Sequence, residues 1–152
     1  MVVTKIMTEE NKMVQYSDNS LLAEIENSNR QAYCSLDLSD ENNKKLLLKI
    51  SQNADDTVAN YLNKEFYLAN VFIQRYDSIN EDTGEVVTRN RTILIDKDGK
   101  SYASASKGLF NSLRNLIGIM GTPDTWESPI LVRVVEKGVK NGGKTYIIEP
   151  VI

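Results

Sequence analysis

Histidine is absent from the sequence and cysteine occurs once, and these two features exclude most catalytic and metal-binding designs. Without histidine there is no Ser-His-Asp or Cys-His catalysis and no histidine-based zinc or haem site. Cys34 has no second cysteine with which to form an intramolecular disulfide, so we expect a buried apolar residue in a protein of the reducing cytoplasm. The sequence therefore predicts a protein that is not an enzyme and holds no metal and no cofactor.

Long apolar runs are also missing. The longest one, 129–135, is interrupted by Arg133 and is far shorter than the roughly 18 residues of a membrane helix. The first twelve residues contain no apolar stretch of the kind that a signal peptide needs. With 152 residues, 41% of them hydrophobic and 26% charged, the composition is that of one globular domain with an extension. We expect no membrane partner.

The net charge of −3 conceals an uneven distribution along the chain. Residues 1–64 carry 7 basic and 10 acidic side chains, whereas residues 86–146 carry 10 basic and 5 acidic ones, a local net charge of +5. Because distribution matters more than the total, the acidic sum does not argue against a nucleic-acid partner for the later part of the chain.

The first sixty residues give only weak structural signals. A short helix is expected at 21–25, and Ser39 is a candidate cap for a second helix, although the apolar run at 46–50 fits a short strand equally well. Scattered apolar residues before residue 17 are too few to build a core. We therefore interpret residues 1–60 as a helical or irregular extension, and hypothesise that it contacts a neighbouring protomer in a homo-oligomer. A disordered tail is the alternative.

From residue 64 onward the pattern becomes that of a β domain. Strands are predicted at 65–76, 86–96, 101–106, 129–137 and 144–151, and Asp98-Gly99 is the strongest hairpin signal. A helix capped by Ser106 is predicted between the third and fourth strands, and it ends at Gly121. This order predicts an all-β fold with one inserted helix, a five-stranded OB-fold barrel over residues 61–152.

Two literal motif matches fail because their surroundings are wrong. Residues 138–145, GVKNGGKT, fit the phosphate-binding loop GxxxxGK[ST], which needs a helix directly after it. The chain continues instead with strand-like residues, so we predict a hairpin loop whose lysines can contact a polyanion. Residues 96–99, DKDG, resemble the start of a calcium loop but lack the closing glutamate, and a hairpin turn is predicted there.

Basic and aromatic residues alternate along the predicted strands, a combination that favours binding of single-stranded nucleic acid. Bases stack on aromatic rings, while Arg and Lys neutralise phosphates. The candidate single-stranded-DNA-binding residues are Arg89, Arg91, Tyr102, Lys107, Trp126, Arg133, Lys137, Lys140, Lys144 and Tyr146. Tyr67 and Tyr76 are weaker candidates, because one face of the first strand must fill the barrel. Alternating arginines are equally typical of a solvated face, and rim aromatics often pack rather than bind.

Two stretches carry a resemblance to a known family. They are DTGEVVTRNRTILIDKDGKSYASASKGLFNSL and MGTPDTWESPILVRVVE. From about residue 62 to residue 151 the chain resembles the small single-stranded-DNA-binding proteins of phages and conjugative plasmids of Gram-positive bacteria. The resemblance implies an OB-fold, single-stranded DNA as partner without sequence preference, self-association along the strand, and action in the cytoplasm of a bacterial host. Unlike cellular bacterial single-strand-binding proteins, this sequence ends in the apolar IEPVI rather than an acidic tail.

The function predicted from the sequence is thus a non-sequence-specific protein that coats single-stranded DNA in phage or plasmid replication or transfer. An OB-fold module that binds a partner protein of a replication or mobilisation complex, without touching DNA, is the alternative, and the acidic total charge slightly favours it.

Overall fold

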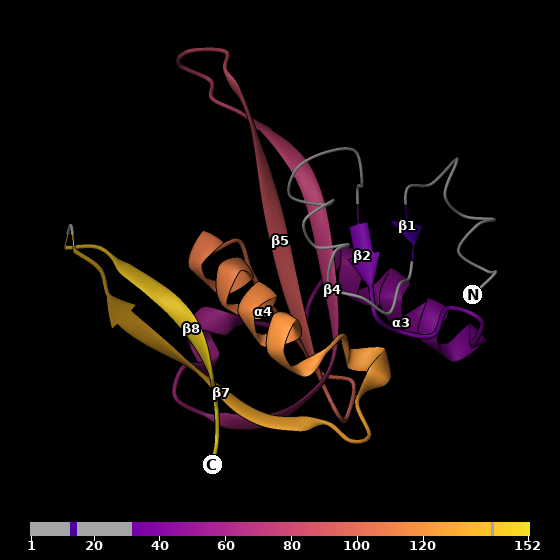
Figure 1. Cartoon of the computed structure of the whole chain (residues 1–152). Coiled ribbons are helices and arrows are strands. Elements are labelled where there is room, and N and C mark those ends of the chain that lie inside the picture. The colour runs from indigo at the N-terminus through magenta and orange to yellow at the C-terminus, as the bar shows by residue number, and fades with distance from the viewer. Residues whose placement is uncertain (1–12, 15–31, 141) are drawn as a thin grey trace.

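The structure is a computed structural model, and it describes residues 13–14, 32–140 and 142–152. One mostly antiparallel sheet curls around helix α4, and helix α3 lies against the other side of the sheet (Figure 1). The strands and helices in chain order are β1 (Met13–Val14), β2 (Ala32–Cys34), α3 (Glu41–Gln52), β3 (Asp56–Thr57), β4 (Glu65–Ile79), β5 (Val86–Asp96), β6 (Ser101–Ser104), α4 (Lys107–Met120), β7 (Ile130–Gly138) and β8 (Lys144–Pro150). Short 3-10 helices follow β3 (η1, Val58–Tyr61) and α4 (η2, Pro123–Thr125).

The sheet is an open, curled half-barrel of eight strands rather than the predicted five-stranded barrel. Strand β4 pairs with β5 on one edge and with β7 on the other, β5 continues to β6, and β7 continues to β8. Within the described part of the chain no pairing joins β6 to β8, so the curl does not close. The architecture is mostly β with two helices, and it is consistent with an OB-like fold.

The three additional strands come from the first sixty residues. β2 pairs with the middle of β4, beyond the segment that pairs with β7, and β3 covers the free edge of β6. Such coverage protects sheet edges from pairing with other chains. The described part of the predicted extension thus shares the sheet of residues 61–152, while the division into two domains at residue 60 stays a prediction. The helix expected at 21–25 lies outside the described residues.

A bulge in β4 lets this strand serve one continuous core. Between Leu68 and Asn70 the register with β5 shifts by one residue. Before the shift Phe66 and Leu68 face α4, and after it Val71 and Ile73 do so. Without the extra residue the alternation would turn the second half of the strand to the opposite face. The larger core therefore runs unbroken from the sheet to α4, β7 and β8.

A second core lies on the other face of the sheet, beneath α3. Leu47 and Ile50 of the helix pack there with Phe72, Ile93 and other buried residues. The ambiguous apolar run at 46–50 is therefore helical, and Asp40 rather than Ser39 caps the helix by accepting a 2.8 Å hydrogen bond from the Asn42 N–H. Cys34 is fully buried in this core, as predicted, and its burial raises the pKa of the thiol to about 12.

Helix α4 packs on the inner side of the curled sheet. Ser106 caps it as predicted, accepting a 3.1 Å hydrogen bond from the Leu109 N–H, and the helix ends at Gly121, whose φ of 85° favours glycine. The first turn lies directly against β8. A Cβ at Gly108 would overlap Thr145 Oγ1 and would lie 2.9 Å from Thr145 Cβ. A glycine at 108 is therefore what allows helix and hairpin to approach.

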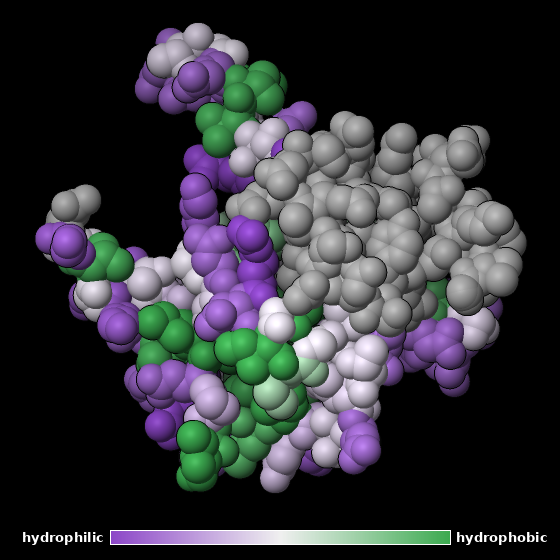
Figure 2. Space-filling model, in the orientation of Figure 1, coloured by the Kyte–Doolittle hydropathy of each residue, from purple (hydrophilic) through white to green (hydrophobic). Residues whose placement is uncertain are grey.

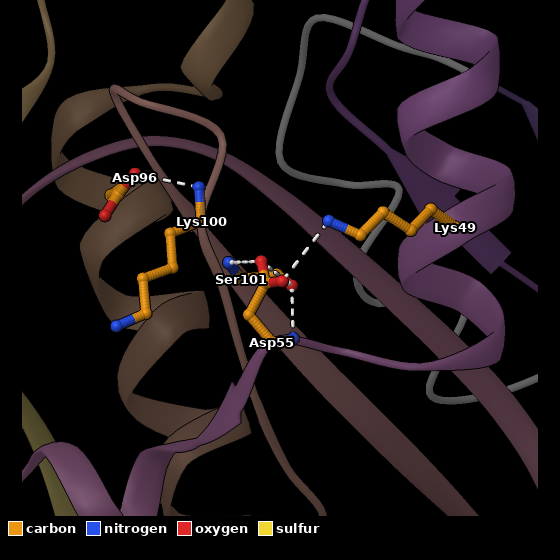
Figure 3. Close-up of polar contacts among 5 residues, drawn as sticks. All are labelled: Lys49, Asp55, Asp96, Lys100 and Ser101. Carbon is orange, nitrogen blue, oxygen red and sulfur yellow. Dashed lines mark hydrogen bonds and ion pairs between the residues drawn. The ribbon is translucent and has the colours of Figure 1, made fainter.

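Three polar groups fasten the segment after α3 to the start of β6 (Figure 3). Asp55 Oδ2 accepts hydrogen bonds from the Ser101 N–H at 2.9 Å and the Ser101 hydroxyl at 3.1 Å. Lys49 Nζ lies 3.3 Å from Asp55 Oδ1. The Ser101 N–H, assisted by Lys49, lowers the pKa of the Asp55 carboxyl, and partial burial opposes this effect. The contact ties α3 to the sheet across 46 residues of sequence.

We predict that Gly108→Ala lowers the free energy of unfolding by about 1–3 kcal/mol, the usual range for overpacking, because Thr145 must move away. Gly138→Ala is the matched control, since a Cβ at Gly138 meets nothing within 4 Å. Urea unfolding of both variants measures the difference. Equal stabilities of the two variants would contradict the close approach of α4 and β8.

We predict that Asp55→Asn costs about 1.5–3 kcal/mol at pH 7, the range for hydrogen bonds to a charged group. The pKa of the Asp55 carboxyl is lower in the folded protein than in the unfolded chain. The ionised carboxylate therefore stabilises the fold fully at pH values above the unfolded-state pKa, and this stabilisation is lost as the pH falls through the folded-state pKa. The difference from the wild type should therefore shrink below about pH 4, the ordinary range of aspartate. Asp98→Asn, at an exposed turn aspartate, is the control. A pH-independent difference would contradict this assignment.

Candidate nucleic-acid interface

Two hairpins project from the body, and the first turn of α4 lies between them in the view of Figure 1. One is the long β4–β5 hairpin and the other is the β7–β8 hairpin. A groove of about 340 Å³ lies where the β4–β5 hairpin meets the start of α4. Its lining residues are Arg75, Val87, Thr88, Arg89, Asn90, Ala105, Lys107 and Phe110. We call this cavity the basic groove.

The basic groove exists because β4 and β5 continue as a two-stranded ribbon beyond the cores. Their pairing extends to Ile79 and Val86, with Arg75 opposite Asn90 and Tyr76 opposite Arg89. The buried pattern ends near residue 74 on β4 and residue 92 on β5, so the side chains beyond are polar or exposed. Figure 2 shows hydrophilic side chains along the stem of this hairpin. Polar groups of the ribbon and the first turn of α4 therefore line the same groove.

The basic groove combines three cationic side chains with no carboxylate among its lining residues. Arg75 comes from β4, Arg89 from β5 and Lys107 from the first turn of α4. The turn at the end of the ribbon is acidic instead, with Glu81, Asp82 and Glu85. A polyanion is therefore attracted to the base of the hairpin and repelled from its end.

The β7–β8 hairpin adds a second set of cations on the other side of the α4 first turn. Lys137, Lys140 and Lys144 are all exposed, and only the last of them has a described ion pair, a contact of 3.6 Å with Glu136. Gly138 and Lys144 are paired at the end of the ladder, so GVKNGGKT is a hairpin turn as predicted and no helix follows it. Tyr146, on β8, is half-buried against the larger core.

Two of the predicted binding residues, Arg89 and Lys107, therefore line one groove, and the three lysines lie on the other hairpin. The remaining predicted residues have other surroundings. Arg91 Nη1 donates to the Ser51 carbonyl near the end of α3 at 3.5 Å. Arg133 forms ion pairs with Glu65 at 3.8 Å and Glu149 at 3.3 Å.

Two of the predicted aromatic residues serve the fold instead. Tyr102 is 1% exposed, its ring packs between Tyr61 and Phe66, and its hydroxyl donates to Asp96 Oδ2 at 3.0 Å. Burial raises the pKa of the Tyr102 hydroxyl. We correct its predicted role, since a buried ring offers no face to a base. Trp126 is half-buried, and its Nε1–H donates to the Met120 and Gly121 carbonyls at the end of α4.

The exposure of the tyrosines does not follow the ranking expected from the sequence, and their role in DNA binding stays a prediction. Tyr67 and Tyr76 are 43% and 37% exposed, because the bulge in β4 places them on the face opposite the larger core. Tyr76 lies across the ladder from Arg89. Arg75, which lines the basic groove, is not among the residues predicted from the sequence. Arg75 and Tyr76 both lie in the run QRYD, where the apolar residues of the strand end. That change in composition indicates where the strand extends beyond the core.

A second group of cations and rings lies at the far end of β5. Lys64 Nζ and Lys100 Nζ lie 4.9 and 5.1 Å from the centre of the Tyr61 ring. These residues were not predicted. Tyr61 is only partly exposed and packs on the core, so a ring face for stacking is less accessible here than at Tyr76.

We predict that Tyr76→Ala weakens binding of oligo-dT by roughly 5- to 100-fold, the range for losing one base stacked on a ring. Tyr102→Phe should leave that affinity unchanged and lower stability by about 1 kcal/mol, because it removes only a buried hydrogen bond. Fluorescence anisotropy and urea unfolding measure the two effects. A loss of affinity in Tyr102→Phe without a change in stability would contradict the correction.

The comparisons with known proteins agree with the chemistry of this surface. Residues 26–149 match the family described as Phage Single-stranded DNA-binding protein, a match that includes both helices and the strands from β2 to β7. The match supports a phage family and gives no support to the plasmid part of the predicted resemblance. No curated protein and no solved structure matches the chain. Because the match covers most of the sequence, the chain belongs to the phage single-stranded DNA-binding protein family.

Proposed function

We propose that this protein binds single-stranded DNA without sequence preference and coats it during phage replication in the cytoplasm of the host cell. The observation that carries the proposal is the basic groove, where Arg75, Arg89 and Lys107 from three elements gather without a carboxylate among the lining residues. Membership of the family supports it. The curled sheet is further proposed to be an OB-fold, with α4 closing one end of the barrel.

The chemistry of such binding needs no catalytic group. Arginine and lysine side chains neutralise phosphates and release the counterions that surround the strand. Tyr76 offers an exposed ring beside Arg89, and base–ring stacking tolerates every base because each has a π face. We propose that the strand crosses the base of the β4–β5 hairpin and the first turn of α4, then passes the lysines of the β7–β8 turn. Self-association through the first residues of the chain stays a prediction.

The test is an anisotropy titration of labelled oligo-dT at several salt concentrations. The wild type should bind at low salt, and its affinity should fall steeply as salt rises. Replacing both Arg89 and Lys107 by alanine should weaken binding and reduce the slope of log K against log salt by about 1.4, or about 0.7 for each lost phosphate contact on a single strand.

Lys97→Ala is the control, because Lys97 lies in the β5–β6 turn at the other end of β5 and pairs with Asp98 at 3.4 Å. It should keep the wild-type slope. Absence of wild-type binding at low salt, or binding without any salt dependence, would overturn the proposed function. An unchanged slope in the double variant would remove these two residues from the interface.

A further inference from the structure

The β4–β5 ribbon ends in an acidic turn beside an exposed aliphatic pair. Ile79 and Val86 form the last pair of the ladder, and they are 64% and 58% exposed. The turn between them is fixed by its own hydrogen bonds, because the Asn80 N–H donates to the Glu85 carbonyl at 2.8 Å and Asn80 Oδ1 accepts from the Asp82 N–H at 2.9 Å. Within the described part of the chain no ion pair neutralises the carboxylates of this turn, which are Glu81, Asp82 and Glu85.

The β7–β8 hairpin ends with the opposite charge, and it also exposes an aliphatic side chain. Val139 is 46% exposed, and its backbone N–H and carbonyl bond to Gly143 and Gly142, which closes the turn. Lys137 and Lys140 are exposed and have no ion pair among the described residues. Figure 2 shows apolar surface beside hydrophilic surface at the ends of both hairpins. The two ends are thus complementary in charge, and each carries apolar surface that burial would stabilise.

The two hairpin ends of one copy lie apart. In Figure 1 the hairpins leave the body in different directions, with the first turn of α4 between them. Both ladders are paired up to their turns, so bending one hairpin onto the other would break those pairs. The complementary partner of each end is therefore a second copy of the chain. Because the two surfaces differ, such a contact is heterologous, and it leaves one end of each kind free for the next copy.

We propose that the end of the β4–β5 ribbon docks on the β7–β8 turn of a neighbouring copy bound to the same DNA strand. Glu81 faces the cation of Lys140 across this contact, and Ile79 packs against Val139. Repetition of the contact produces a row of copies that follows the strand. The inference rests on the proposed function, because the strand is what brings the copies together.

The contact is weak by itself and becomes effective on the strand. Two hairpin ends bring together far fewer than the roughly 20–30 residues a side of a standard interface, and exposed ion pairs contribute little. Copies bound side by side on one strand are held at an effective concentration on the order of 1 mM, at which a weak contact forms. Lys137 and Lys144, on the strands of the hairpin, remain for DNA phosphates. The contact therefore acts on the cooperativity of binding to long DNA.

The experiment measures the affinity per copy on a long poly-dT and on a short oligo-dT that holds one copy, and their ratio is the cooperativity. Glu81→Lys should lower this ratio about 10-fold, because one attraction becomes a repulsion. Its affinity for the short oligo-dT should not fall, since a carboxylate is replaced by a cation. Lys140→Glu should lower the ratio by a similar factor. Lys97→Glu and Asp98→Lys make the same charge changes at the exposed β5–β6 turn, and these controls should keep the wild-type ratio.

The double variant, Glu81→Lys with Lys140→Glu, separates a contact between copies from a contact with DNA. It restores opposite charges across the contact, so its ratio should return to within about 2-fold of the wild type. If Lys140 contacted phosphates alone, the second substitution could not restore the ratio. Ile79→Thr tests the apolar part of the contact. It should lower the ratio and leave the affinity for the short oligo-dT unchanged.

The outcomes separate the contact from the function. If the wild type fails to bind the short oligo-dT, the proposed function fails and the contact fails with it. If the wild type binds and its ratio is close to one, the function stands and the contact is wrong. A wild-type ratio in Glu81→Lys would overturn the ribbon end as a docking surface. A double variant whose ratio stays as low as that of the single variants would overturn its pairing with the β7–β8 turn.

Discussion

Strand β4 buries side chains on both faces, and the remainder of the structure depends on how it does so. Its first residues pair with β7, its middle pairs with β2, and almost all of it pairs with β5. The bulge after Leu68 keeps apolar side chains facing α4 on either side of the register shift. At the same time Phe72 faces the core beneath α3. One strand thus joins two cores, and neither helix could be placed without it.

The proposed binding surface is a consequence of where this burial ends. Past residue 74 neither core reaches the ribbon, so Arg75, Tyr76, Arg89 and Asn90 are placed by backbone pairing rather than by packing. A paired two-stranded ribbon holds such side chains at fixed spacing. The first turn of α4, fixed against β8 by the close approach at Gly108, supplies Lys107 from the other side. The groove is therefore lined by a paired strand ribbon on one side and by a helix turn packed against β8 on the other.

Much of this fold could be predicted from the sequence, and the failures have physical causes. The bounds of β5 and the cap and end of α4 follow from local patterns, namely strand residues before Asp98-Gly99 and apolar spacing between Ser106 and Gly121. Strands β2 and β3 have three and two residues, too short for any periodicity to register. They form because they cover edges of strands distant in sequence.

The candidate site was predicted in part for a related reason. The charge pattern indicates the cationic residues on the hairpins, but the sequence does not show where the alternation of β4 is interrupted. The bulge reverses the two faces, so the exposed tyrosines are Tyr67 and Tyr76, and the aromatic residue expected to stack, Tyr102, is in the core. The sequence does not distinguish Arg75 from a solvated arginine, because its place opposite Asn90 and in a groove with Lys107 depends on how distant segments pair and pack.

The central claim is that single-stranded DNA lies across the base of the β4–β5 ribbon and the first turn of α4. Mapping of backbone amide chemical shifts during addition of a short oligo-dT tests it most directly. We expect the largest changes at Arg75–Tyr76, Arg89–Asn90, Lys107 and the β7–β8 turn. Changes confined to α3 or to the Tyr61–Lys64–Lys100 group at the far end of β5 would contradict it.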